Sequence, residues 1–155
     1  AGRKIMEKKF EIRIFSGLDT YFDQALLIRT KVFVEEQNVP IELERDEFDA
    51  TAVHALVFCD ARAVATGRMF PDPAGTATLK LGRVAVLKEF RGHGAGKAVI
   101  SELLRVAAAR KDVRQILIHA QKAVVGWYEA LGFSVCSDEF LEAGIVHQEM
   151  VLRLS

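Results

Sequence analysis

The chain has 155 residues, half of them hydrophobic, and its 21 lysines and arginines balance its 21 aspartates and glutamates. This length and composition fit one globular domain with its own core. The neutral charge does not indicate nucleic acid or an anionic membrane as a partner. Apolar runs are far shorter than a membrane span and no signal peptide is visible, so we expect a cytoplasmic protein.

The expected domain covers residues 6–155, because no linker, repeat or low-complexity run divides the chain. Residues 1–5 precede Met6 and are interpreted as a disordered extension or a remnant of expression. Cys59 and Cys136 fall in expected strands and lack metal-ligand spacing. We therefore expect reduced thiols in or near the core, and no metal site.

In the first half, alternating apolar residues predict strands, and one longer pattern predicts a helix. An acidic segment follows that helix, and Asp60 to Arg62 form the turn of a hairpin. In chain order, the expected elements are a strand at Phe10–Phe15, a helix at Leu18–Val34, the acidic segment Glu35–Asp49, and strands at Ala52–Cys59, Ala63–Phe70 and Thr78–Val86.

The second half alternates helices and strands. The expected elements are a helix at Gly96–Arg110, a strand at Gln115–Ala120, a helix at Ala123–Leu131 ended by Gly132, and strands at Phe133–Cys136 and Val146–Leu154. The order β-α-β-β-β-α-β-α-β-β predicts an α/β (α+β) class, in which a mixed sheet carries helices on its faces.

The segment joining the strand at Thr78–Val86 to the next helix contains three closely spaced glycines. A glycine-rich turn before a helix exposes backbone N–H groups at the positive end of the helix dipole, which makes it an anion site. A P-loop is excluded because only three residues separate Gly92 from Gly96, and a dinucleotide fingerprint is excluded because the spacing is G-x-G-x-G. The remaining pattern is R-x-x-G-x-G, from Arg91 to Gly96.

This pattern resembles the acyl-CoA pyrophosphate loop of the GNAT superfamily of N-acetyltransferases. Three further segments resemble the same superfamily: LGRVAV its fourth strand, HAQKAVVGWYEALGF its fifth strand with the following helix and a Y-x-x-x-G-F signature, and EFLEAGIVHQEM the closing loop of the ElaA/YjcF-type branch. IRTKVFVEEQNVPIELERDEFD resembles the opening of that branch. The resemblance implies one domain with a mostly antiparallel mixed sheet of about seven strands, splayed between strands 4 and 5, and about four helices.

The resemblance implies acetyl-CoA as the co-substrate. Glycines let a phosphate approach the backbone closely, and nearby lysine and arginine side chains neutralise it; the alternative is a glycine-rich helix entry with solvated charges. The splayed strand is expected to pair its backbone with the pantetheine arm, and an amide at the end of the fifth strand to contact that arm. The implied cofactor residues are Val84, Ala85, Val86, Arg91, Gly92, His93, Gly94, Ala95, Gly96, Lys97, Gln121 and Tyr128.

Tyr128 is the candidate catalytic acid, because it occupies the tyrosine of the Y-x-x-x-G-F signature and a phenol near the sulfur can protonate the departing thiolate. The alternative is a tyrosine that only packs. For the base, the glutamate of histone-type members aligns with Lys80, which cannot readily accept a proton. The replacements considered are His54, His119, His147, Glu35, Glu36, Asp46 and Asp49, with His147 preferred because the closing loop presents it, and a water chain also open.

Arg29 lies near the middle of an apolar helical stripe, so its guanidinium needs a carboxylate partner if it points inward. Glu35, Asp46 and Asp49 are the candidates. An internal ion pair is the preferred interpretation, and the alternative is an acceptor pocket in which Arg29, Glu35 and His54 contact the substrate.

We therefore predict an N-acetyltransferase that moves an acetyl group from acetyl-CoA to a primary amine by direct attack. The alternative is a non-catalytic acyl-CoA-binding or sensor module with the same fold. The expected partner is a small-molecule amine or a peptide, without nucleic acid or membrane, and a homodimer is plausible from the resemblance. The segment 35–49, with seven acids against Arg45, mildly favours a cationic acceptor.

Overall fold

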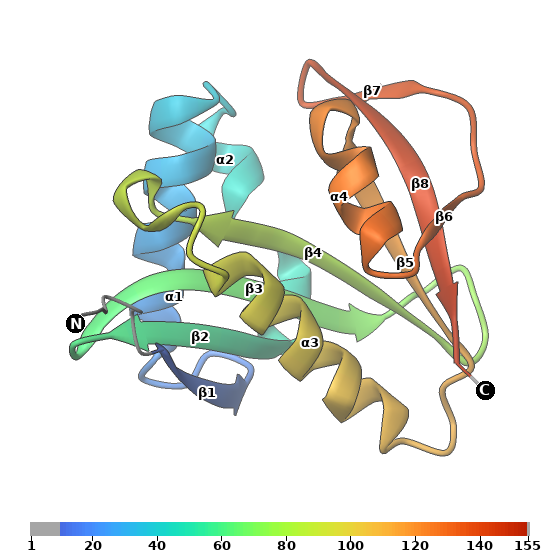
Figure 1. Ribbon diagram of the computed structural model, residues 1–155, viewed down its shortest axis with the longest axis horizontal. Coiled ribbons are helices and arrows are strands. Elements are labelled where there is room, and N and C mark those ends of the chain that lie inside the picture. Colours follow the sequence, from blue (N-terminus) through green and yellow to red (C-terminus); the bar gives the residue numbers. More distant parts are fainter. Residues whose placement is uncertain (1–9, 155) are drawn as a thin grey trace, which may run out of the picture.

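The computed structural model describes residues 10–154 and shows an open eight-stranded mixed sheet (Figure 1). The strands lie in the order β1-β2-β3-β4-β5-β8-β6, and β7 pairs with the first three residues of β8. Only β4 and β5 are parallel, and every other pair is antiparallel. The strands are β1 Phe10–Ser16, β2 Val53–Cys59, β3 Arg62–Pro71, β4 Thr78–Val86, β5 Gln115–Gln121, β6 Ser134–Val135, β7 Phe140–Glu142 and β8 Ile145–Arg153.

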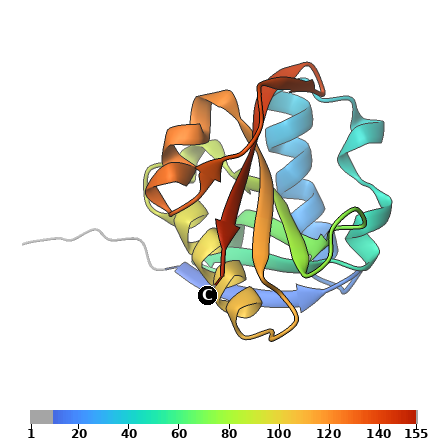
Figure 2. The same ribbon diagram turned by 90° about the vertical axis from the view of Figure 1, so that its right-hand side faces the viewer.

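Helices cover both faces of this sheet. Figure 2 shows α1 and α2 on one face and α3 and α4 on the other, and each face has its own apolar core. No helix within residues 10–154 combines the length and the hydropathy that crossing a membrane requires. The helices are α1 Phe22–Arg29, which continues as the π-helix η1 Thr30–Glu36, α2 Ile41–Glu44, α3 Ala95–Ala108 and α4 Val125–Ala130, with 3₁₀ turns η2 Glu47–Ala50, η3 Lys88–Phe90 and η4 Lys122–Val124.

The two parallel strands separate part-way along their length, as the resemblance predicted. They pair from Thr78 opposite Gln115 to Leu81 opposite Ile118, and no further. Beyond that point β4 stays bonded only to β3, and β5 only to β8. Figure 1 shows β4 and β5 diverging from the lower right of the view. The inner edges of both strands therefore face an opening in the sheet.

The expected strands and helices are observed, with differences in the first helix and near the C-terminal end and with short helices α2 and η2 inside the acidic segment. The helix expected at Leu18–Val34 begins at Phe22, and its second half is a π-helix, marked by the Gln37 N–H that bonds to the Val32 carbonyl. Strand β7 was missed because it has three residues, too few to show a period. Cys136 lies just beyond β6 and is exposed, whereas Cys59 is buried as expected. The predictions for residues 1–5 concern a part of the chain outside the residues that the structure describes.

A buried ion network ties helix α1 to the segment that precedes β2. The Arg29 guanidinium donates to both Asp49 oxygens, at 2.7 and 3.2 Å, and both side chains are 1% exposed. Arg68, from β3, donates to the same Asp49 at 2.7 Å and to Asp46 at 2.5 and 2.7 Å. The preferred interpretation of Arg29, an internal ion pair, is therefore the one observed.

The network sets the acid sensitivity of the fold. Burial raises the pKa of Asp49, but the hydrogen bonds and charge of Arg29, followed by Arg68, outweigh it and lower the pKa from 3.8 to about 2. A carboxyl with a lowered pKa stabilises the folded state above its unfolded pKa. That stabilisation is lost as the pH falls from about 4 toward 2.

Asp49→Asn should lower the free energy of unfolding by about 3–5 kcal/mol at pH 7, because it removes the buried negative charge that Arg29 and Arg68 share. The difference from the parent chain should shrink as the pH falls toward 2. Urea denaturation at several pH values measures both. Asp112→Asn, which breaks an exposed pair with Arg110, is the control and should change stability little. An equal effect of the two substitutions would contradict the role assigned to the network.

Candidate active site

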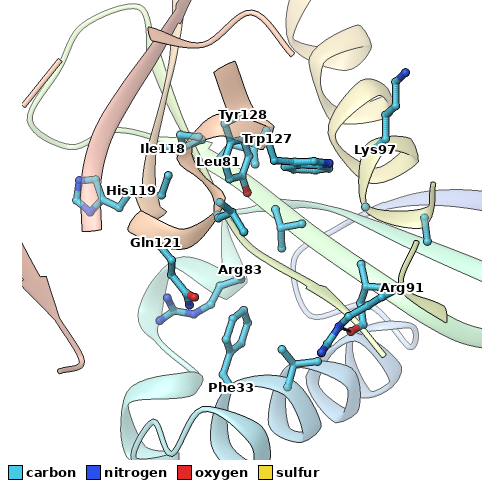
Figure 3. A pocket seen from close by; sticks show the side chains of 18 of the residues that line it. Phe33, Leu81, Arg83, Arg91, Lys97, Ile118, His119, Gln121, Trp127 and Tyr128 are labelled. Atoms are coloured by element: carbon cyan, nitrogen blue, oxygen red, sulfur yellow. Dashed lines mark hydrogen bonds between the residues drawn. The ribbon is translucent and has the colours of Figure 1, made fainter. Parts of the chain in front are cut away.

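A cavity of about 590 Å³ occupies the opening between β4 and β5. Its walls come from η1, β4, the glycine-rich turn, β5, α4 and the β7–β8 hairpin. Figure 3 shows Arg91 and Lys97 at one side of this cavity, Tyr128 and Gln121 near its middle, and His119 at the opposite side. The cavity thus runs from a basic, glycine-rich end to an end that carries histidines.

The glycine-rich turn places free amides at the first end. Gly94 precedes α3 with a φ of +88°, and no side chain caps the helix. The first amides of a helix have no carbonyl partner within it, so they remain available to an anion. Gly92 also has a positive φ, +82°, a conformation that favours glycine. Of the turn residues expected to bind the cofactor, all but His93 line the cavity: Arg91, Gly92, Gly94, Ala95, Gly96 and Lys97.

Arg91 joins this turn to the end of helix η1. Its Nε donates to the Val86 carbonyl at 3.0 Å, and its Nη2 donates to both Glu36 oxygens at 2.9 and 2.8 Å. The guanidinium is 43% exposed, so the pair is accessible to solvent and exchangeable. Glu36 is therefore bonded to the Arg91 guanidinium at the place where a phosphate would contact the turn.

The inner edge of β4 forms one wall. Val84 and Val86 line the cavity, whereas the side chain of Ala85 is buried on the other face. A bulge interrupts the β3–β4 register between Gly82 and Ala85, and Arg83 has a φ of +51° there. Bulges redirect side chains locally, and Arg83 lines the cavity. Sequence reasoning missed Arg83, because nothing in a strand-like run marks the extra residue.

Tyr128 projects from the short helix α4 into the middle of the cavity (Figure 3). Its ring packs edge-on against Trp127 and Phe133. The side chain forms no hydrogen bond with another residue in the described part of the chain. Burial raises the pKa of Tyr128 to about 12. The phenol is therefore a protonated donor aimed at open space.

Gln121 links the end of β5 to the end of η1. Its Nε2 donates to Oε1 of Gln37 at 2.8 Å, and both residues line the cavity. The π-helical geometry of η1 sets the position of Gln37, because its amide bonds five residues back, to Val32. π-helical turns are often found at functional sites. Gln37 was not predicted, since sequence patterns do not separate a π-helix from an α-helix.

At the far end, Glu142 lies between two histidines. His119 places Nδ1 2.9 Å from Glu142 and Nε2 3.1 Å from Glu149. Carboxylates only accept, so both ring nitrogens carry hydrogen and the imidazole is charged. The hydrogen bond from Glu142 is the main cause that raises the pKa of His119 above 6.5. Across residues 10–154, no group of three His, Cys, Asp or Glu side chains is arranged to hold a metal.

His147 has a different hydrogen-bond pattern. Its Nδ1 lies 2.7 Å from the Ile145 carbonyl, which can only accept, so Nδ1 carries the hydrogen. Nε2 then offers a lone pair, 3.7 Å from Glu142. The side chain is 8% exposed and lines the cavity. When its ring is neutral, His147 can therefore accept a proton at Nε2, whereas both ring nitrogens of His119 already face carboxylates.

Three residues proposed for the acceptor pocket do not reach the cavity. Arg29 is held by Asp49, and His54 is buried with its Nε2 3.1 Å from the Asp49 carbonyl and its ring stacked on Phe15. Glu35 is exposed on η1 and does not line the cavity. The inward stripe that suggested a pocket is instead the contact between α1 and the sheet.

Glu142 was the most important omission from the predicted site. A signal for it was present: Phe140-x-Glu142 and Ile145-x-His147-x-Glu149 alternate, so these residues share one face of a hairpin. The turn residues Ala143 and Gly144 both have positive φ, as a tight two-residue hairpin requires. Strand β7 has only three residues, too few to be predicted, and Glu142 was therefore not placed in the site.

Comparisons with known proteins agree with this architecture. The family description "Acetyltransferase (GNAT) domain" matches residues 18–154. The chain belongs to the GNAT acetyltransferase family. It is 39% identical over 129 residues to the uncharacterized N-acetyltransferase YjcF of Bacillus subtilis, covering 82% of this chain and 89% of YjcF.

Solved GNAT structures have the same fold. The crystal structure of Escherichia coli ElaA superposes with a TM-score of 0.81 at 26% identity, over 92% of this chain and 99% of ElaA. An acyl-CoA N-acyltransferase from Pseudomonas aeruginosa gives a TM-score of 0.82 at 24% identity, over 95% and 100% of the two chains. The latter likeness supports the fold alone.

The pairing of Glu142 with His119 can be tested by titration. Proton NMR of the histidine rings should give His119 a pKa above 6.5, and Glu142→Gln should lower that pKa because it removes the largest cause of the shift. A raised histidine pKa stabilises the fold below pH 6.5, and this contribution disappears as the pH rises through the folded value. Glu139→Gln, which removes an exposed partner of Lys122, should leave His119 unchanged. An unshifted His119 in Glu142→Gln would refute the assignment.

Proposed function

We propose that the protein transfers an acetyl group from acetyl-CoA to a primary amine by direct attack. The observation that carries the proposal is the opening between β4 and β5, which has an uncapped glycine-rich helix start at one end and a buried phenol at its middle. Membership of the GNAT family supports an acyl-CoA donor. The non-catalytic sensor alternative is less favoured, because a binding module has no need of a phenol and a lone-pair histidine facing the same space.

The cofactor would lie along the opening. The amides of the turn, with Lys97 and Arg91, would hold the diphosphate, and Arg91 would exchange Glu36 for it. The edge of β4 at Val84–Val86, which pairs with no strand on the side of the opening, would bond the amides of the pantetheine arm, as a strand partner would. Gln121 would contact the same arm from β5. The thioester would then lie near the middle of the cavity, beside Tyr128.

In the reaction, the amine nitrogen forms a bond to the acyl carbon and the carbon–sulfur bond breaks. His147 accepts the ammonium proton at Nε2, directly or through water, and so frees the lone pair that attacks. Tyr128 donates a proton to the departing sulfur, which leaves as the CoA thiol. The nitrogen loses its second proton as the amide forms, and that proton restores the Tyr128 hydroxyl through water. Burial raises the pKa of the phenol, but the same low-dielectric surroundings raise the basicity of a buried thiolate, so the donor remains matched to its acceptor.

Tyr128→Phe should lower kcat about 100-fold, since general acid catalysis contributes roughly that factor or more. The KM for acetyl-CoA should change little, because phenylalanine keeps the packing on Trp127 and Phe133. Thiol release from acetyl-CoA measures both constants. Tyr21→Phe, outside the cavity, is the matched control. Unchanged kcat in Tyr128→Phe would remove the phenol from the mechanism.

Calorimetric titration with CoA tests the binding half of the proposal. Gly94→Ala should weaken CoA binding at least about tenfold, because a methyl group would stand where a phosphate must approach the backbone. Gly144→Ala is the control: its φ of +77° gives similar strain, and neither added Cβ meets an atom within 4 Å. No CoA binding by the parent chain would overturn the proposal. Tight binding without turnover of any amine would favour the sensor alternative.

A further inference from the structure

A second hollow, of about 370 Å³, continues from the histidine end of the first cavity. The two share residues, among them Gln121, Glu142 and His147. Away from these shared residues, the hollow extends past Lys80 on β4 and Arg68 on β3 to Asp46 and the stacked pair Phe48–Phe70. If acetyl-CoA fills the first cavity, the second is the space left for the acceptor.

One wall of this hollow carries positive side chains, of which Lys80 is open to a ligand. Lys80 lines it and forms no hydrogen bond or ion pair with another residue that the structure describes. Arg68 also lines it, with a side chain 5% exposed. Asp46 and Asp49 occupy the Nη atoms of Arg68, but its Nε is the one buried side-chain nitrogen or oxygen in the described part of the chain that lacks a partner. That nitrogen has almost no accessible surface, so Arg68 adds positive charge to the wall, and Lys80 is the cation that a ligand can contact.

The opposite wall carries an excess of negative charge. The protonated His119 lies between the carboxylates of Glu142 and Glu149, so the three groups sum to about −1. Glu142 also faces His147, the candidate proton acceptor. An ammonium group attracted to Glu142 would therefore arrive beside the atom that can deprotonate it.

The two walls are close together. The charge of Lys80 is among the causes acting on the pKa of His119, and that of Arg83 acts on Glu142. The register gives the same result: Lys80 lies opposite Leu117, and Leu117 and His119 are alternate residues of β5 that point to one face of the sheet. The Phe48–Phe70 pair, with ring centroids 4.3 Å apart, provides an apolar surface in the same hollow.

We propose that the acceptor is an amino carboxylate, such as a free amino acid, whose amine contacts Glu142 and whose carboxylate contacts Lys80. The proposal rests on the acetyl transfer proposed above and names its substrate class. It also replaces the cationic acceptor suggested by the acidic segment 35–49, because the arginines of the buried network already neutralise Asp46 and Asp49.

Matched substrates test this proposal. With saturating acetyl-CoA, thiol release is measured for phenylalanine against phenethylamine and for lysine against cadaverine, pairs that differ by the carboxylate. The value of kcat/KM should be at least about tenfold higher for the amino acid of each pair, since one hydrogen bond to a charged group is worth that factor. Phenylalanine amide should behave as the amine does.

Substitution of Lys80 then assigns the preference to a residue. Lys80→Met should bring the kcat/KM ratio within each pair close to one, and Lys80→Arg should retain most of it. Lys111→Met, at an exposed lysine after α3, should retain the full ratio. Thermal unfolding checks that each variant is folded.

The outcomes separate the two proposals. Amines turned over as fast as amino acids, or a ratio that Lys80→Met leaves unchanged, would overturn the amino carboxylate assignment while acetyl transfer stands. If the parent chain binds CoA but acetylates neither member of any pair, nor a broader set of amines, then transfer itself fails and the assignment fails with it.

Discussion

The separation of β4 from β5 is the constraint on which the rest of the structure depends. Backbone N–H and C=O groups are almost always paired in folded proteins, so two parallel strands that stop pairing after four residues must be held apart. Each strand stays paired on its outer side, β4 with β3 as far as Val86 apart from the bulge at Arg83, and β5 with β8 as far as Gln121. The bulge at Arg83 bends β4 away from its neighbour, and the hydrogen bond between Gln121 and Gln37 anchors β5 to η1 across the opening.

The elements around the opening are held by charge as well as by packing. Helix α1 and the segment before β2 meet through Arg29 and Asp49, and Arg68 extends that contact into β3. A buried carboxylate with two guanidiniums is costly to assemble and more costly to break, so it fixes geometry more than it adds net stability. For the site, the network matters because it fixes the position of Arg68. The same network that joins α1 to the sheet presents Arg68 to the second hollow.

Sequence reasoning went furthest where a residue pattern has one physical meaning. Gly92 and Gly94 have the positive φ that favours glycine, and the turn before α3 is where it was expected. The strand order and the splay followed from four segments that resemble one superfamily. Tyr128, Gln121 and His147 were each named from those segments, and all three line the cavity.

What the sequence could not supply were contacts between segments distant along the chain. Glu36 lies 55 residues from Arg91, and Gln37 lies 84 residues from Gln121, yet both pairs are bonded. No local period encodes such pairs. For the same reason, Arg29 could be assigned a carboxylate partner in general but not Asp49 in particular. The π-helix and the bulge each insert one residue, and that shift changes which side chains face the cavity.

The two histidines at the far end show why residue type alone does not define a role. His119 and His147 lie on neighbouring strands, on the face of the sheet that carries Glu142 and Glu149. His119 meets a carboxylate at each nitrogen and is therefore charged, whereas His147 gives one nitrogen to a main-chain carbonyl and keeps a lone pair on the other. Glu142 contacts both, so a proton taken up by His147 would be stabilised by a carboxylate that His119 already orients. The register of β5, β7 and β8 sets these hydrogen-bond partners. Two identical side chains therefore have different roles: His119 holds a charge between two carboxylates, and His147 can accept a proton.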